Sequence, residues 1–234
     1  MPSESLPPVV MYQTWRDLLF LHWDFDPADV QASLPPGLAV DTFENRAWIG
    51  FVPFFMQGVR PRGLPAVPVL SDFLELNIRT YVRDRQNRRG VWFYSLDCNQ
   101  PIAVQLARLG FSLPYFDAVM SASKLGSRVD YTSRRCGTAA TCSVSYRPNG
   151  TAARAAAGSL DEFLVERYRL FAFNGKNLLT GCVSHAPYEI APAAWSGNPT
   201  PPLELAGFPT NRAPSHAVLS PGVKVRIHAP GQVR

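Results

Sequence analysis

Short apolar runs separated by turn-forming residues recur along this chain, and they predict strands more often than helices. The two clearest strands are Phe73–Arg83 and Gly90–Cys98, and the polar segment DRQNR between them predicts a hairpin. Further hairpins are expected across residues 43–45 and across the Asn-Gly turn at 174–175. The remaining predicted strands are Leu18–Phe25, Leu38–Thr42, Arg46–Gly58, Tyr115–Ser123, Arg128–Arg134, Ala139–Arg147, Tyr168–Phe173, Leu178–His185 and Val223–His228.

Two short helices are predicted from the residues that begin them. Asp26 precedes Pro27, which is typical of a helix start, because the aspartate accepts from free backbone N–H groups and proline suits the first helical position. Ser159 stands three residues before Glu162, which is the spacing of a capping box, and it predicts a helix over Leu160–Arg167. Both helices are short, so strands remain the dominant element.

Two further segments have less regular patterns. A third helix is predicted from Pro101 to Gly110, because apolar residues recur there at helical spacing and glycine is a natural stop. The Pro-rich segment 186–222 is expected to be irregular, yet packed over the core, because it carries several large apolar residues. Residues 1–10 are expected to form a loose tail.

The number and spacing of these elements indicate the fold class. About ten predicted strands and three short helices are joined mostly by turns too short for parallel crossovers. We therefore expect an α+β fold that is mostly antiparallel β, with a curved or closed, barrel-like sheet and a few short helices. Neither a repeat nor a linker is visible, so residues 1–234 are expected to form one domain. A closed sheet would create an interior, where small-molecule sites are common.

Composition and charge place the chain among globular proteins, with 46% hydrophobic and 18% charged residues. The formal net charge of +5 comes mostly from scarce acidic residues rather than from abundant basic ones. One basic cluster, Arg83, Arg85, Arg88 and Arg89, lies between two predicted strands. A solvated turn is expected there, and contact with phosphate or nucleic acid is the alternative. Without a nucleic-acid module to accompany the cluster, we expect no nucleic-acid partner.

Cellular location and partners are only loosely constrained. The apolar runs are too short to span a bilayer, and residues 1–8 lack the features of a signal peptide, so we expect a cytoplasmic protein without a membrane partner. The four cysteines show no CxxC pair and are expected to be reduced. A homo-oligomer is compatible with the sequence, which does not specify the number of subunits.

Motifs for cofactors, metals and nucleophilic catalysis are absent from the sequence, including GxGxxG, the P-loop, HExxH and GxSxG. The four histidines are scattered without ligand spacing, so we expect neither a metal site nor a cofactor. Cys182 and His185 suggest a nucleophile and its base. Three residues apart on a strand they would point to opposite faces, so a structural role is expected for both.

The strand Phe73–Val82 carries the most informative pattern, because alternation sorts its residues onto two faces. Glu75, Asn77, Arg79 and Tyr81 share one face, which is either solvated or the polar inner wall of a barrel. On an inner wall, Arg79 could bind an anionic ligand group and Glu75 could orient a ligand or transfer a proton. Glu75 and Arg79 could also neutralise each other, which would be a purely structural use.

Several stretches together form one family pattern. They are WRDLLFLHW at 15–23, LPPGLAVDTF at 34–43, FLELNIRTYV at 73–82, GVWFYSLD at 90–97, QLARLGF at 105–111, LPYFDAVM at 113–120, GSLDEFLVERYRLF at 158–171 and HAPY at 185–188. In these stretches, which cover nearly the whole chain, the sequence resembles the YqjF-like family of domains of unknown function. Members of that family resemble acetoacetate decarboxylase in fold, which implies a barrel-like mixed sheet with a central pocket.

The resemblance also implies that a catalytic group is missing. Acetoacetate decarboxylase forms a Schiff base on a lysine whose pKa is lowered by a second lysine beside it. The proline and two lysines of that site fall on Pro114, Tyr115 and Phe116, so both amines are replaced. The three lysines of this chain lie elsewhere and are expected at the surface. By the same fold-level analogy, Glu75 matches an acidic residue of the decarboxylase pocket.

Tyr115 therefore stands where a nucleophile would be expected. A phenol is mostly protonated at neutral pH, so it acts more readily as a hydrogen-bond donor or general acid than as a substitute for an amine. Arg79 or Arg108, if near, could stabilise the phenolate or bind a substrate carboxylate. The alternative is that Tyr115 only packs, with its hydroxyl satisfied.

Two functions of different classes are compatible with this sequence. The first is an enzyme that acts on a small oxo acid or related carbonyl compound by acid–base chemistry, without a Schiff-base lysine. The second is a non-catalytic binding module for an apolar or weakly acidic ligand. A third, structural interpretation treats the basic turn at 83–89 as a partner surface. The residues assigned to the site are Tyr115 and Glu75 as catalytic, and Arg79, Asn77, Tyr81 and Arg108 as substrate-binding.

Overall fold

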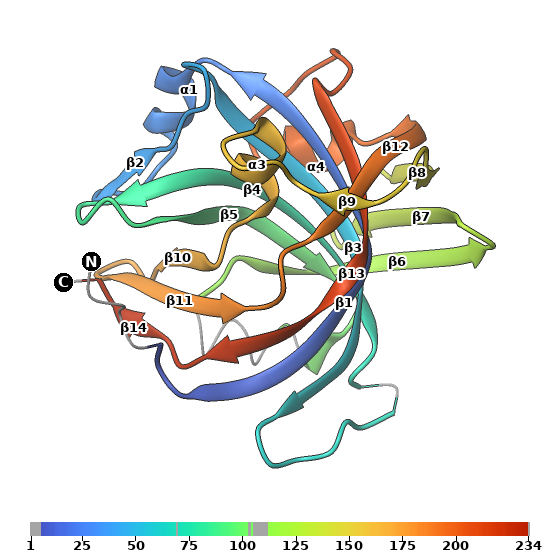
Figure 1. The fold of residues 1–234 in the computed structure, drawn as a ribbon, viewed down its shortest axis with the longest axis horizontal. Coiled ribbons are helices and arrows are strands. Elements are labelled where there is room, and N and C mark those ends of the chain that lie inside the picture. The colour runs from blue at the N-terminus through green and yellow to red at the C-terminus, as the bar shows by residue number, and fades with distance from the viewer. Residues whose placement is uncertain (1–5, 69, 103, 105–111, 234) are drawn as a thin grey trace.

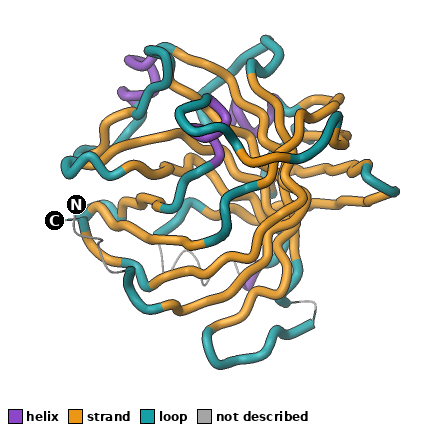
Figure 2. Tube along the Cα trace, viewed as in Figure 1, coloured by secondary structure: helices purple, strands orange, loops and turns teal. Residues whose placement is uncertain are grey.

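Strands make up most of the molecule, and the sheet curls round on itself (Figures 1 and 2). The computed structural model describes residues 6–68, 70–102, 104 and 112–233. The strands are β1 Val9–Phe25, β2 Leu38–Val40, β3 Ala47–Pro61, β4 Phe73–Asp84, β5 Arg89–Cys98, β6 Tyr115–Leu125, β7 Arg128–Arg135, β8 Cys142–Pro148, β9 Ala153–Arg154, β10 Arg169–Phe173, β11 Leu178–Ser184, β12 Glu189–Asn198, β13 His216–His228 and β14 Gly231–Gln232. The helices are α1 Pro27–Ala32, α3 Leu160–Val165 and α4 Thr200–Leu205.

Strand pairing closes the sheet. Nine strands form a closed barrel. Neighbouring strands are hydrogen-bonded in the order β1, β3, β4, β5, β6, β7, β8, β12 and β13, and β13 pairs back with β1. β10 and β11 connect β5 to β13 and close a smaller ring of seven strands, which shares β13, β1, β3, β4 and β5. Parallel pairing occurs between β5 and β6 and between β5 and β10. The predicted fold class, a mostly antiparallel barrel-like sheet with a few short helices, is confirmed.

The strands shared by the two rings carry an apolar core on each face. One core contains Leu21 and Leu76 and packs against β7 and β8. The other, which we call the ring core, contains Phe20, Tyr81 and, from α3, Leu164. Because successive residues of a strand point to opposite sides, both faces of β4 are buried. The polar residues on one face of β4 therefore lie inside the seven-strand ring.

The capping residues behave as the sequence predicts. Asp26 accepts a hydrogen bond of 2.8 Å from the backbone N–H of Ala28 at the start of α1. Ser159 accepts from the backbone N–H of Glu162 at 3.2 Å, and the Glu162 carboxylate accepts from the backbone N–H of Gly158 at 2.6 Å. α3 thus has a fixed first turn. The helix predicted from Pro101 to Gly110 falls mainly outside the described residues.

Two expectations about pairing were wrong. β2 does not form a hairpin with β3, because both edges of β3 are occupied by β1 and β4, and β2 pairs instead with the end of β4. Residues 43–45 are closed only by an isolated bridge between Phe43 and Arg46. Val9 and Val10, which were expected to belong to a loose tail, lie in β1, where Val9 pairs with His228. The hairpins β4–β5 and β10–β11 are confirmed.

Prolines concealed regular structure in the segment 186–222. It contains β12, α4 and the first residues of β13, and Leu203 and Phe208 from it are buried as expected. Pro221 lies in β13 at a break in its pairing with β1, between the pairs Leu18–Ser220 and Arg16–Gly222, which keep the same register. A proline without an N–H is tolerated at such a break, so its presence does not exclude a strand. Among the described residues, no helix combines the length and apolar character needed to cross a membrane.

Candidate functional site

The polar face of β4 is almost fully removed from water. Glu75 is 3% exposed, Asn77 5%, Arg79 9% and Tyr81 0%. In the neighbouring strand β3, Phe54 is paired with Glu75 and Gly50 is paired with Arg79. A solvated polar face, the alternative considered from the sequence, is therefore not what the structure has. The residues instead line the wall of the ring core.

Glu75 and Tyr115 meet inside this wall. Tyr115 begins β6 and pairs with Leu96 of β5, which brings its ring to the same side of the sheet as Glu75. The phenol donates a hydrogen bond of 2.8 Å to Oε2 of Glu75. The hydroxyl of Tyr131 donates to the backbone carbonyl of Glu75 at 2.9 Å. The side chain and the backbone of Glu75 are thus each held by a tyrosine that lies 40 or more positions away.

Burial changes the acid–base properties of this pair. Desolvation raises the pKa of Glu75 to about 7, although hydrogen bonds from Tyr115 and Asn77 act in the opposite direction. Burial and the neighbouring Glu75 carboxylate hold the pKa of Tyr115 well above its usual value. Near neutral pH the carboxyl group can therefore lose or gain a proton, whereas the phenol keeps its own. This is the division of roles that a general base and a hydrogen-bond donor require.

Arg79 lies further along the same face and does not join this pair. Its guanidinium donates to the backbone carbonyl of Leu164, at 3.2 Å, near the end of α3. It also lies over the rings of Phe20 and Tyr81, at 5.5 and 5.7 Å from their centroids. Among the described residues, its Nε and the Oδ1 of Asn77 have no hydrogen-bond partner. Among the described residues no ion pair joins Glu75 to Arg79, and Arg79 is not among the groups that shift the pKa of Glu75, so the alternative in which the two neutralise each other has no support here.

The sequence analysis missed a row of residues beside Arg79. Strand register aligns His216 of β13, His22 of β1, Gly50 of β3 and Arg79 of β4. A Cβ atom at Gly50 would lie 3.0 Å from the His22 ring and 3.5 Å from Cγ of Arg79, so the glycine leaves room for both side chains. His22 and His216 are 194 positions apart, and no local spacing could have revealed their contact.

The remaining predicted residues are placed as follows. Tyr81 is buried, with its hydroxyl 2.6 Å from Nε2 of His22. Arg108 lies outside the described residues. The lysines occupy the surface: Lys124 pairs with Asp17, and Lys176 and Lys224 are exposed. The decarboxylase amine therefore has no lysine equivalent in the ring core.

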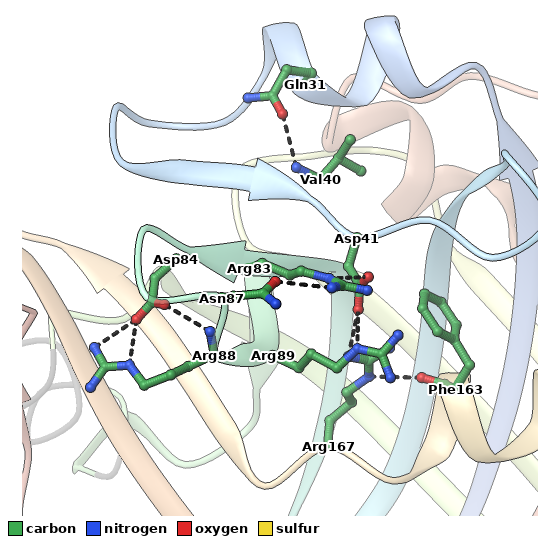
Figure 3. A network of polar contacts seen from close by, with 10 residues as sticks. All are labelled: Gln31, Val40, Asp41, Arg83, Asp84, Asn87, Arg88, Arg89, Phe163 and Arg167. Carbon is green, nitrogen blue, oxygen red and sulfur yellow. Dashed lines mark hydrogen bonds and ion pairs between the residues drawn. The ribbon is translucent and has the colours of Figure 1, made fainter. Parts of the chain in front are cut away.

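The basic turn is built around two buried aspartates rather than being merely solvated (Figure 3). Arg83 and Arg89 pair with Asp41 at 2.6 and 3.1 Å, and Arg88 pairs with Asp84 at 2.6 Å. The side chains of both aspartates are fully buried. Much of the positive charge that the sequence places here is thus compensated within the chain. Within the described part of the chain, no group of three histidine, cysteine, aspartate or glutamate side chains could hold a metal ion.

Comparison with known proteins matches this chain to one family and one fold. A family model, DUF2071, described as uncharacterized conserved protein, matches residues 12–224. The uncharacterized protein YqjF of Bacillus subtilis (strain 168) is 40% identical over 180 residues, which are 76% of this chain and 74% of that protein.

Solved structures of low sequence identity share the fold. Acetoacetate decarboxylase from Legionella pneumophila superposes with a TM-score of 0.68 at 13% identity, covering 100% of this chain and 92% of that one. An acetoacetate decarboxylase-like enzyme from Sphingomonas wittichii RW1 gives 0.69 at 15% identity, covering 100% and 97%. The enduracididine biosynthesis enzyme MppR, solved with pyruvate, gives 0.66 at 14% identity, covering 99% and 92%. MppR is also known with the condensation product of pyruvate and imidazole 4-carboxaldehyde.

Proposed function

Because the chain belongs to the DUF2071 family and has the fold of acetoacetate decarboxylase, we propose that it is an enzyme acting on a small oxo acid or related carbonyl compound. The proposed reaction is enolisation by acid–base chemistry at Glu75 and Tyr115, without a Schiff base. The observation that carries this proposal is the 2.8 Å hydrogen bond from the partly buried Tyr115 to the buried carboxyl group of Glu75, whose pKa is raised to about 7.

Each group has a defined part in the proposed step. The Glu75 carboxylate takes a proton from the carbon next to the substrate carbonyl, and the electrons of that C–H bond form the C=C bond of an enolate. Tyr115 turns its O–H from Glu75 to the carbonyl oxygen and stabilises the negative charge that develops there. Returning the proton from Glu75 to carbon completes the cycle. A carboxyl group with a pKa near the working pH is well suited to both directions.

Substrate binding is assigned to the neighbouring polar atoms of β4. Asn77 lies between Glu75 and Arg79 on the same face, and its unpartnered Oδ1 can accept from a hydroxyl group. The unpartnered Nε of Arg79 can donate to a carboxylate, which would also offset the cost of burying the guanidinium. An oxo acid has both a carboxylate for Arg79 and a carbonyl for Tyr115.

Two observations support the choice of substrate class and mechanism. MppR, which shares the fold, has been solved with pyruvate and with a condensation product of pyruvate, and condensation at the pyruvate methyl carbon requires an enolate or its equivalent. A sequence identity of 14% shows a shared fold and does not identify the substrate of this chain, so pyruvate is used in the test below as a probe. The lysines of this chain lie at the surface, which favours a reaction without an imine.

The test is exchange of the pyruvate methyl protons in D2O, followed by proton NMR. The wild-type protein should accelerate exchange over buffer. E75Q should lower the rate by about 10²–10⁴-fold, because the base is removed while the shape is kept. Y115F should lower the catalytic rate by about 10²-fold or more with a smaller effect on apparent affinity. E204Q, a change at an exposed glutamate, is the matched control and should exchange at the wild-type rate.

Two outcomes would contradict the proposal. One is the lack of accelerated exchange with pyruvate and with a panel of other oxo acids and ketones. The other is a covalent adduct on any lysine after borohydride reduction in the presence of pyruvate, measured by mass spectrometry, which would show imine chemistry instead.

A non-catalytic binding module is the second candidate, and the unmet hydrogen-bonding atoms of Asn77 and Arg79 favour it as much as they favour the enzyme. Calorimetry with pyruvate distinguishes the two when it is combined with the exchange assay. A binding module would retain its affinity in Y115F, lose it in R79K, where the Nε donor is removed but the charge kept, and exchange no protons.

A further inference from the structure

Four side chains from four elements form a continuous series of hydrogen bonds beside Arg79. Asp161 of α3, whose side chain is 43% exposed, lies 2.8 Å from Nε2 of His216. Nδ1 of His216 lies 2.9 Å from Nδ1 of His22. Nε2 of His22 in turn lies 2.6 Å from the hydroxyl of Tyr81, which is fully buried in the ring core. The series therefore connects solvent with the barrel interior.

The direction of each hydrogen bond in the series follows from the one that Tyr81 makes at the buried end. The hydroxyl of Tyr81 donates to the backbone carbonyl of Leu164 at 2.8 Å, and a carbonyl can only accept. With its single proton used in this way, Tyr81 must accept from Nε2 of His22. Nδ1 of a neutral His22 is then an acceptor, so Nδ1 of His216 must donate to it.

These hydrogen-bond directions require one additional proton at the outer end of the series, between His216 and Asp161. If His216 were neutral, its Nε2 would carry no proton and would face the Asp161 carboxylate, two acceptors at 2.8 Å. A proton between them removes the conflict and makes His216 an imidazolium paired with Asp161. The geometry is thus that of a series that holds one proton more than its neutral imidazoles and phenol supply.

The charges around the two histidines identify which of them carries this proton. His22 is buried, and burial, His216 and the Arg79 guanidinium all lower its pKa. The pKa of His216 is also lowered, because burial has the larger effect, but Asp161 opposes that effect at His216, and no carboxylate does so at His22. The additional proton therefore belongs on His216.

The inner end of the series is also surrounded by cations. Tyr81 faces both Arg79 and Arg167, whose charges favour the phenolate, yet burial has the larger effect and raises the pKa of Tyr81. The phenol consequently keeps its proton until an acceptor more basic than the Leu164 carbonyl is present. A ligand alkoxide or enolate oxygen would be such an acceptor.

We propose that Asp161, His216, His22 and Tyr81 form a proton relay that carries one proton from solvent to an oxygen of a ligand bound in the barrel interior. The relay supplies an acid in addition to Glu75, and Tyr81 is the residue of the four that contacts the ligand. The other three are positioning residues that act through Tyr81. The inference rests on the proposed function only for the nature of the ligand oxygen.

The transfer balances at every link. Tyr81 gives its O–H proton to the ligand oxygen and receives the Nε2 proton of His22. His22 receives the Nδ1 proton of His216 on its own Nδ1. His216 is left with one proton, on Nε2, and His22 now carries its own on Nδ1. The starting arrangement returns when one proton is taken up from solvent at the outer end and the imidazole rings turn, so that His22 again carries its proton on Nε2 and His216 is protonated on both nitrogens. One proton has then entered from water and one has reached the ligand, with no change of oxidation state.

The test is nitrogen NMR of the wild-type protein labelled with ¹⁵N-histidine, recorded from pH 5 to pH 9 without any ligand. His22 should carry its proton on Nε2 throughout. His216 should lose a single proton within this range. In D161N the apparent pKa of His216 should fall by about one unit or more, a tenfold loss of proton affinity, because the carboxylate that raises it is removed. H228Q changes a histidine outside the series, which is bonded to Pro7 and Ser184, and should leave these signals unchanged.

The relay would be overturned if His22 carried its proton on Nδ1, if His22 and His216 lost protons independently, or if D161N left the titration unchanged. These results do not depend on the enolisation assay, so failure of the relay and failure of the proposed function are distinguishable. Where methyl exchange is observed, H216Q should change its pH profile with little effect on apparent affinity. An unchanged profile would also contradict the relay.

Discussion

The guanidinium of Arg167 lies 2.8 Å from the carboxylate of Asp41, and both side chains are almost excluded from water, at 3% and 0% exposed. Arg83 and Arg89 of the β4–β5 hairpin contact the same carboxylate (Figure 3). Arg167 also donates to the backbone carbonyl of Phe163, within α3. A single buried aspartate thus connects the hairpin, α3 and the segment after β2.

Replacing Asp41 should destabilise the protein strongly. D41N removes the one carboxylate that these three guanidiniums share and leaves Arg167 buried without a counter-charge. Breaking a buried ion pair in this way typically costs about 3–5 kcal/mol. Urea denaturation followed by circular dichroism measures the loss. D130N, at a solvent-exposed pair with Arg128, is the control and should leave the midpoint nearly unchanged. Similar midpoints for the two variants would show that the Asp41 cluster adds little stability.

Glu75 should make the stability of the protein depend on pH. Its pKa is raised from 4.5 to about 7 in the folded state, so between these values the folded chain binds more protons than the unfolded chain. Stability from this group is therefore full below about pH 4.5 and is lost as the pH rises through 7. The loss is on the order of 3 kcal/mol, since one unit corresponds to about 1.4 kcal/mol.

E75Q removes this dependence, because glutamine is neutral at every pH. The free energy of unfolding of E75Q minus that of wild type should therefore be larger at pH 8 than at pH 5. Urea denaturation at the two pH values measures this difference. E204Q, at an exposed position, should show no such increase. A difference between E75Q and wild type that stays constant with pH would mean that the carboxyl group titrates normally.

Gly50 should not tolerate a side chain. In G50A the new Cβ would lie 3.0 Å from the His22 ring and 3.5 Å from Arg79, and both neighbours are buried. We expect a loss of about 1–3 kcal/mol, as for other additions to a packed core. The same variant should move the His22 signals in the nitrogen spectrum. G231A, where a Cβ meets nothing within 4 Å, is the matched control. Equal stability of the two variants would show that His22 and Arg79 can move enough to make room for the added methyl group.

The candidate site was only partly accessible from the sequence. Alternation along β4 correctly grouped Glu75, Asn77, Arg79 and Tyr81 on one face, because side-chain direction in a strand is a local property. Alternation could not show whether that face was exposed to solvent. It is buried because the ring core covers it, and the ring core is assembled from β1, β3, α3 and other segments that are distant in the sequence.

Local chemistry in the sequence determined the position of most strands, the caps of α1 and α3 and the absence of a lysine at position 115. Only the tertiary structure decided that β2 pairs with β4, that Tyr115 reaches Glu75, and that His22 reaches His216. The physical reason is that register and closure are set by which apolar faces pack together. Contacts between residues 40 to 194 positions apart leave no trace in the short-range periodicity of a chain.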